Sequence, residues 1–187
     1  CDDPAGTENF VSVYDQGSQK PTTIVDKYQY TSMEVVPTKQ EVQRTCLKVD
    51  AADMKANPWD SQFFIYFPGV TFKTGDTWAI KMNVRADKEA TVGTQTHNKP
   101  SEYIHWAAIG SVPFTPEWTE YTAEGTMTAE QNGGSTFAFN LNDFKEANTY
   151  YFDDLSFTLN GKELMKNGSC DDPAGTENFV SVYDQGS

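Results

Sequence analysis

The sequence contains few residues suited to metal or disulfide chemistry. Its 187 residues include two histidines and three cysteines, which are Cys1, Cys46 and Cys170. The spacing of these cysteines matches neither a disulfide framework nor a zinc motif, and two histidines do not make a zinc site. Cys46 lies in the strand-like run TCLKV, where we expect a buried thiol. A bridge between Cys46 and one of the other two cysteines is the alternative.

Long apolar runs and positive charge are also scarce. No apolar run approaches the roughly 18 residues that a membrane-spanning helix needs, so we expect no membrane insertion. We find no signal peptide, although a mature chain would have lost one. The chain has 14 Lys and Arg residues against 27 Asp and Glu residues, a formal net charge of −13. Because nucleic acids and anionic membranes bind basic surfaces, we expect neither as a partner, and neutral ligands remain.

What the sequence has in abundance is aromatic residues and alternation with a period of two. It contains 12 Phe, 9 Tyr and 4 Trp. Apolar and polar residues alternate in short segments that end at Gly, Pro, Asn or Asp, which is typical of β-strands, and no long segment has helical spacing. The predicted strands are Phe10–Tyr14, Tyr28–Val36, Thr45–Val49, Ser61–Phe67, Thr77–Arg85, Thr91–His97, Tyr103–Ile109, Trp118–Met127, Ser135–Asn142 and Thr149–Leu159.

These strands predict the fold class. Roughly nine to eleven strands at this spacing favour an all-β protein, a β-sandwich jelly roll of two antiparallel sheets. Ser61–Phe67 is apolar on both faces and is expected to be central in its sheet. Polar residues that face away from the core on a concave sheet would line a cleft. The candidates are Asn83, Arg85, Gln95, His97 and Asn140.

An 18-residue segment occurs twice. Cys1–Ser18 and Cys170–Ser187 both read CDDPAGTENFVSVYDQGS, at an offset of 169 residues (170 − 1). A period that long corresponds to a whole domain and not to a solenoid repeat. We therefore predict a jelly-roll module over residues 1–162 and a duplicated end segment over residues 163–187. Either a second module begins at Cys170, or the end segment alone was duplicated.

Three stretches in fixed order carry a resemblance to a known family. They are NPWDSQFF (57–64) followed by FKTGDTWAIKMNVRA (72–86), FTPEWTEY (114–121) and TYYFDDLSF (149–157). Together they resemble the carbohydrate-binding modules of families 4, 9 and 22, over about residues 46–159. The resemblance implies a non-catalytic jelly roll that binds a β-linked plant polysaccharide in a cleft, with xylan favoured and β-glucan next. It also implies an attached glycoside hydrolase and a secreted or bacterial cell-surface location.

The family usually opens with a strand similar to N-G-x-F-E. The closest text here is LMKNGSCD (164–171), directly before the second copy of the repeat. We therefore expect the C-terminal segment to supply an opening strand, to its own sandwich or by strand exchange to a second copy of the chain. Only one copy of the repeat is expected to pack on this chain's own sheets in a family-like position, while the other lies apart or docks on a neighbour. A tandem array of modules is another interpretation.

A sugar site of this kind needs flat aromatic rings that stack on a pyranose and polar side chains that bind its hydroxyls. Tyr103 and His105 share one strand face, whereas Trp106 shares a face with Ile104 unless a bulge intervenes. Each candidate also has an ordinary structural role as its alternative, and Trp78 and Trp118 are expected to be structural. The predicted carbohydrate-binding residues are Trp59, Gln62, Arg85, Tyr103, His105, Trp106 and Asn140.

The resemblance also implies a structural calcium ion near Asp153. Alternation points Asp153 inward, and a buried carboxylate needs a partner. Asp2 or Asp171 would contribute a further oxygen, and a hydrogen-bonded structural Asp153 is the alternative.

Catalysis is the main competing function. A jelly-roll glycosidase needs a pair of carboxylates, often as Glu-x-Asp-x-x-Glu on one strand, and this pattern is absent. We therefore expect a binding module and not an enzyme. A small β-sandwich glycan hydrolase or lyase is one alternative. A structural or adhesive module that uses the repeated end for chain-to-chain contact is the other.

Overall fold

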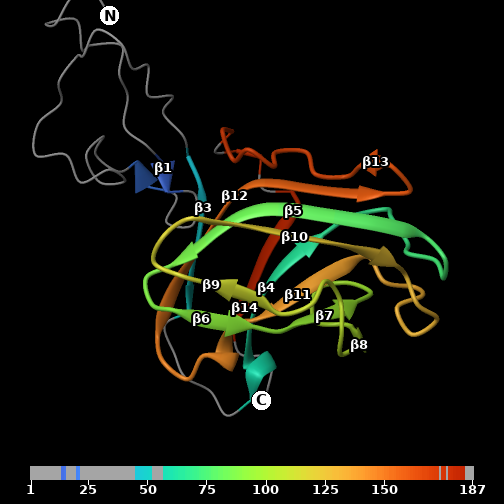
Figure 1. Cartoon of the computed structure of the whole chain (residues 1–187), viewed down its shortest axis with the longest axis horizontal. Coiled ribbons are helices and arrows are strands. Elements are labelled where there is room, and N and C mark those ends of the chain that lie inside the picture. The colour runs from blue at the N-terminus through green and yellow to red at the C-terminus, as the bar shows by residue number, and fades with distance from the viewer. Residues whose placement is uncertain are drawn as a thin grey trace, which may run out of the picture.

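The computed structural model describes residues 14–15, 20–21, 45–51, 57–172, 174–175 and 177–183. These residues form antiparallel sheets and two short 3-10 turns, and no α-helix lies among them. The predicted all-β sandwich is therefore confirmed (Figure 1). None of the described residues forms a helix of the length and apolarity that crossing a membrane requires.

The first large sheet has the order β10-β5-β12-β13. β3 (Leu47–Ala51) also pairs with β12, at the end of β12 opposite to β13. The long alternating runs of the sequence produce its central strands, because every second side chain enters the core. The strands are β5 (Thr77–Ala86), β10 (Thr119–Thr126), β12 (Asn148–Leu159) and β13 (Lys162–Glu163).

The second large sheet has the order β14-β4-β11-β7-β8. β4 (Ser61–Tyr66) lies between two partners, as predicted for a strand that is apolar on both faces. The other strands are β7 (Thr94–His97), β8 (Tyr103–His105), β11 (Thr136–Asn140) and β14 (Phe179–Tyr183). The 3-10 turns η1 (Pro58–Asp60) and η2 (Leu141–Asp143) contact each other beside the ends of β4 and β11.

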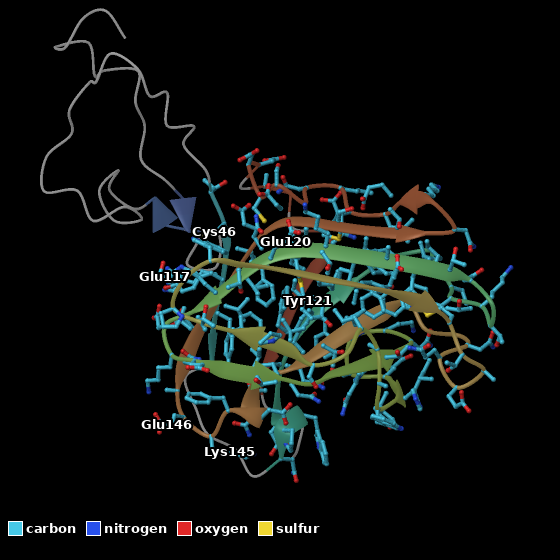
Figure 2. All side chains as sticks on the ribbon, viewed as in Figure 1. Cys46, Glu117, Glu120, Tyr121, Lys145 and Glu146 are labelled. Atoms are coloured by element: carbon cyan, nitrogen blue, oxygen red, sulfur yellow. The ribbon has the colours of Figure 1, made fainter. Side chains whose placement is uncertain are left out.

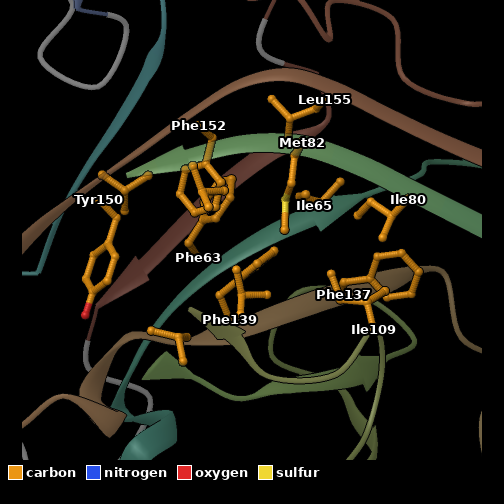
Figure 3. Packing of buried hydrophobic residues seen from close by; sticks show 14 of the residues in the cluster. Phe63, Ile65, Ile80, Met82, Ile109, Phe137, Phe139, Tyr150, Phe152 and Leu155 are labelled. Carbon is orange, nitrogen blue, oxygen red and sulfur yellow. The ribbon is translucent and has the colours of Figure 1, made fainter. Parts of the chain in front are cut away.

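Aromatic side chains fill the space between the two sheets. The Phe63 ring of β4 lies 4.9 Å from the Phe152 ring of β12, and Phe67 stacks on Phe157 at 4.8 Å. Met82, Ile65 and the other core residues labelled in Figure 3 pack around them. Charged side chains such as Glu117 and Glu146 project from the outside of the sandwich (Figure 2).

Two predicted strands differ in the structure. The segment predicted as Thr91–His97 divides at Gly93, whose N–H donates to Asp143 Oδ2 at 2.7 Å, into β6 (Ala90–Val92) and β7. β6 pairs with β9 (Val112–Phe114) in a separate two-stranded sheet. The strand predicted over Tyr103–Ile109 ends at His105. This short strand, β8, pairs with β7 in an irregular register. Tyr28–Val36 lies outside the described residues.

The C-terminal copy of the repeat packs on this chain's own sandwich. β14 pairs with β4 in antiparallel register, from Phe179 opposite Ile65 to Tyr183 opposite Ser61. Cys46 and Cys170 are both buried, and Cys170 belongs to the core cluster. Of the N-terminal copy, the described residues are Tyr14 and Asp15, which form β1 and pair with β2 (Lys20–Pro21). The remainder of that copy lies outside the described residues, so its predicted position stays a prediction.

Candidate functional site

Strand pairing in the second sheet assembles four polar side chains on the face turned away from the core. Phe63, Ile65, Phe137 and Phe139 belong to the core, so their neighbours in β4 and β11 point to the opposite face. We call Gln62, Gln95, His97 and Asn140 the polar row. They lie on three adjacent strands, β4, β11 and β7, and each of them is buried.

The amides of the polar row bond to one another. Gln62 Nε2 donates to Asn140 Oδ1 at 2.7 Å and to Gln95 Oε1 at 3.1 Å. The Gln62 side chain therefore connects β4 to β11 and, beyond it, to β7. Buried amides with fixed partners are held in one orientation, and the row forms a rigid, neutral hydrogen-bonding surface.

His97 extends the row toward β8. Its Nε2 lies 3.2 Å from Gln95 Oε1 and, because a carbonyl oxygen only accepts, Nε2 carries the hydrogen. Burial lowers the pKa of His97 to about 4, so the ring is neutral at neutral pH. Nδ1 is then an acceptor, and it is buried without a hydrogen-bond partner among the described residues. A ligand hydroxyl is one group that would satisfy it.

Exposed aromatic rings flank the polar row. Tyr103 of β8 is 56% exposed and packs edge-on against the His97 ring at 5.8 Å. Trp59 of η1 is 48% exposed and lies three residues before Gln62. The row therefore has an aromatic side chain near each end, which is the combination that a sugar site needs.

The turn that carries Trp59 is fixed by neighbouring polar groups. Asn57 N–H donates to Asp60 Oδ2 at 2.9 Å, and Asn142 Nδ2 donates to the Asn57 carbonyl at 2.6 Å. Pro58 begins the turn, a position that its fixed φ suits. These hydrogen bonds fix the backbone of the turn on which the exposed Trp59 side chain lies.

Trp106 is the most exposed of the large apolar side chains that the structure describes, at 71%. The register between β7 and β8 shifts at Thr96 and His97, which is the kind of irregularity that would take Trp106 off the face of Ile104. Its ring lies 5.4 Å from that of His105. Tyr103, His105 and Trp106 therefore remain together near one end of the row.

Arg85 does not join these residues. It lies on β5, in the other sheet, where its guanidinium stacks 3.7 Å from the centre of the Tyr151 ring and 5.6 Å from that of Trp118. Asp87 lies 3.5 Å from its Nη1. The prediction that Arg85 and Asn83 line the same cleft is wrong, because alternation gives the face of a strand and not the sheet to which the strand belongs.

Asp153 is buried on β12, and its Oδ1 accepts the Asp154 N–H at 2.8 Å. Asp154 Oδ2 accepts from Asn83 Nδ2 at 2.9 Å. The described part of the chain contains no group of three or more His, Cys, Asp or Glu side chains that suits a metal ion. Asp171 is exposed, and Asp2 lies outside the described residues. Around this position, the described residues thus offer one buried carboxylate, that of Asp153, to a calcium ion.

A cavity of about 360 Å³ lies elsewhere, at the end of the first sheet. Polar groups that line it already bond to one another: the Thr149 hydroxyl donates to Asp50 Oδ1, and the Lys88 backbone N–H donates to Asn148 Oδ1, each at 2.9 Å. None of the described residues that line it is aromatic, so they offer no stacking surface for a sugar. The cavity is lined by Asp50, Ala51, Asp87, Lys88, Ala147, Asn148 and Thr149.

Comparison with known proteins adds to this description. No family model and no curated protein matches the sequence. Among solved structures, "PbXyn10C CBM APO" matches with a TM-score of 0.62 and 18% identity, over 79% of this chain and 86% of that one. The chain therefore has the β-sandwich fold of a carbohydrate-binding module, and the resemblance of the three motifs is confirmed at the level of the fold.

Two other solved structures match less closely. "CBM4 structure and function" has a TM-score of 0.48 and 22% identity, over 60% of this chain and 69% of that one. The N-terminal cellulose-binding domain of Cellulomonas fimi β-1,4-glucanase C has a TM-score of 0.46 and 20% identity, over 62% and 79% of the two chains.

Proposed function

We propose that this chain is a non-catalytic carbohydrate-binding module that holds a β-linked plant polysaccharide against the outer face of the β14-β4-β11-β7-β8 sheet. The observation that supports this most directly is the neutral polar row with an exposed aromatic ring near each end. Aromatic rings stack on the apolar face of a pyranose, while amides and a neutral imidazole bind its hydroxyls. A surface without formal charge suits an uncharged polysaccharide.

Xylan is the favoured ligand and β-glucan the next, on the strength of the motif resemblance. In this proposal the module is attached to a glycoside hydrolase and keeps it near its substrate. Such a protein acts outside the cell, secreted or at a bacterial cell surface. The name of the solved structure with the same fold, a CBM of PbXyn10C, is consistent with this role.

The polar row favours binding over hydrolysis. A glycosidase needs two carboxylates close to the bond that it cleaves, and the four side chains of the row are amides and an imidazole. The nearest buried acid in sequence, Asp60, is occupied by Asn57 of its own turn. Release of reducing sugars by the pure protein would contradict the proposal and support a hydrolase.

Affinity gel electrophoresis against xylan, β-glucan, mannan and starch tests the ligand. We expect retardation by xylan and weaker retardation by β-glucan. No retardation by any of the four would favour an adhesive module.

Substitution of the flanking aromatics tests the site. Trp59→Ala, Tyr103→Ala and Trp106→Ala should each weaken glycan affinity about tenfold or more, since a tenfold change corresponds to about 1.4 kcal/mol. Trp118→Ala is the matched control, because Trp118 is an exposed tryptophan beside Arg85, on the other sheet. If all three variants bind like Trp118→Ala with their folds intact, the proposed site is wrong.

A structural calcium ion near Asp153 is a separate proposal that rests on the family resemblance. EDTA should then lower the melting temperature of the wild type and leave that of Asp153→Asn unchanged. Equal melting temperatures with and without EDTA would leave Asp153 as a hydrogen-bonded structural residue. Glycan binding does not depend on this ion in the proposal.

A further inference from the structure

The edge of β4 that faces away from β11 is a docking site for one strand, and the C-terminal copy of the repeat occupies it. β14 pairs with this edge over five residues. Asn178 adds two bonds to Tyr66: its Nδ2 donates to the Tyr66 carbonyl, and its own carbonyl accepts the Tyr66 N–H, both at 2.8 Å. The Phe179 ring stacks on Phe63 at a centroid distance of 6.2 Å.

The first residue of the copy is anchored as well. Cys170 is buried in the core, and its carbonyl accepts a hydrogen bond from the Thr45 hydroxyl. Its N–H donates to the Asn167 carbonyl at 3.0 Å. The three anchors Cys170, Asn178 and Phe179 therefore all belong to the repeated 18 residues.

Each anchor has an identical counterpart in the N-terminal copy. Subtraction of the offset of 169 converts Cys170, Asn178 and Phe179 into Cys1, Asn9 and Phe10. Because the two copies are identical over their whole length, the N-terminal copy has the same side chains and the same backbone donors for the β4 edge. One edge and two matching strands are thus present in a single chain.

We propose that the β4 edge also binds the N-terminal copy of the same chain, so that the two identical segments compete for one position. The same chain is the favoured donor, because residues 19–44 connect the N-terminal copy to Thr45 and can span on the order of 80 Å when extended. A tethered segment acts at a high effective concentration, whereas a strand from a second chain pays the full cost of association.

Residues outside the repeat explain why the C-terminal copy holds the edge. Gly168 accepts the Leu155 N–H at 2.7 Å through its carbonyl, and a Cβ atom at Gly168 would lie only 1.7 Å from the Leu155 oxygen. Asn167 Nδ2 donates to the carbonyls of Asp172 and Gly175. Asn167 and Gly168 directly precede the C-terminal copy, and their hydrogen bonds favour its binding to the β4 edge over that of the N-terminal copy. The N-terminal copy should therefore bind this edge only when the C-terminal copy is weakened.

Matched substitutions in the full chain test the competition. Phe10→Ala should leave the melting temperature unchanged, because the C-terminal copy holds the edge. Phe179→Ala should lower it only slightly, because the intact N-terminal copy replaces the weakened strand. The double variant has no intact copy and should lose roughly 6–20 °C, from the cost of truncating a packed Phe in a domain of this size. The two effects are therefore non-additive.

Alkylation of the cysteines shows directly which copy is bound. The two copies lie in different tryptic peptides, since Lys166 precedes only the C-terminal one. In Phe179→Ala, a short pulse of iodoacetamide should label Cys170 several-fold more than in the wild type and Cys1 several-fold less. Phe10→Ala should leave the labelling of Cys170 unchanged.

Two results would overturn the proposal. Equal losses of melting temperature in Phe179→Ala and the double variant, with unchanged labelling of Cys1, would show that the β4 edge does not accept the N-terminal copy. A dimer of Phe179→Ala in light scattering would show that the donor is a second chain. If Phe179→Ala fails to fold, Asn178→Ala and Asn9→Ala form a milder pair, because Asn178→Ala removes the side-chain hydrogen bonds to the Tyr66 carbonyl and from the Lys166 N–H and leaves the packed Phe179 ring in place.

Discussion

The two outer faces of the sandwich arise from the same alternating pattern but differ in charge and in burial. On the first sheet, Lys81 and Glu120 form an ion pair at 2.7 Å, and both side chains are about half exposed, at 56% and 50%. On the second sheet, Gln62 and Asn140 are neutral and almost fully buried. An outward position in a strand therefore does not fix the character of a face. The first face is a solvated surface, and the second is a preformed set of hydrogen-bonding groups.

Gln62 should give the largest effect in a test of this difference. Gln62→Ala removes the donor to both Asn140 and Gln95 and leaves buried oxygens without that donor. We expect a loss of about 2–3 kcal/mol in the free energy of unfolding and weaker glycan binding. Lys81→Ala on the other face should change stability by less than about 0.5 kcal/mol. Urea unfolding measures both, and equal losses would remove the distinction between the faces.

Acid should destabilise the second face through His97. The pKa of His97 is about 4 in the folded chain, below its ordinary value of 6.5, because burial disfavours the charged ring. The unfolded chain therefore binds the proton first, and this stability is complete above pH 6.5 and is lost as the pH falls toward 4. At pH 4.5 the loss should be about 2–3 kcal/mol.

The control for this prediction is the second histidine. Urea unfolding at pH 7.5 and 4.5 should show a smaller pH dependence for His97→Gln than for the wild type, since other acidic groups titrate equally in both. His105→Gln is the matched variant for the loss of one histidine, because His105 is half-buried and lies outside the polar row. A pH dependence that His97→Gln leaves intact would show that His97 is not the group responsible.

Arg85 should give the smallest effect. Arg85→Ala removes a stacked cation from Tyr151 on the first face, at a cost of about 0.5–1 kcal/mol in stability. Glycan affinity should remain within twofold of the wild type, because Arg85 and the polar row belong to different sheets. A marked loss of glycan affinity, measured by titration calorimetry, would mean that the first face also takes part in binding.

Local patterns predicted most of the strands well. The predicted Thr77–Arg85 differs from β5 by one residue, and the predicted Ser61–Phe67 from β4 by one residue. Both segments have strong alternation or continuous apolarity, and such patterns depend only on neighbours in the sequence. The segment after Tyr103 was predicted less well, since its strand is short and ends in a bulged pairing.

The site was predictable only in part, because strand order is not a local property. Sequence patterns indicated that Gln62, Gln95, His97 and Asn140 face away from the core. They did not reveal that β11 lies between β4 and β7, which brings the amides into contact. Arg85 has the same kind of pattern as Asn140 and lies on the other sheet. The pairing of strands far apart in the chain separates the two cases.

The position of β4 has a consequence for how the module meets its ligand. Both edges of β4 are paired, and five of its six side chains are buried. Its amide hydrogens should therefore exchange with solvent more slowly than those of β10, whose side chains are mostly exposed or half-buried. A glycan at the polar row would rest on one of the stiffest parts of the molecule. Binding then costs the protein little conformational entropy, and most of the entropy loss comes from the ordering of the ligand.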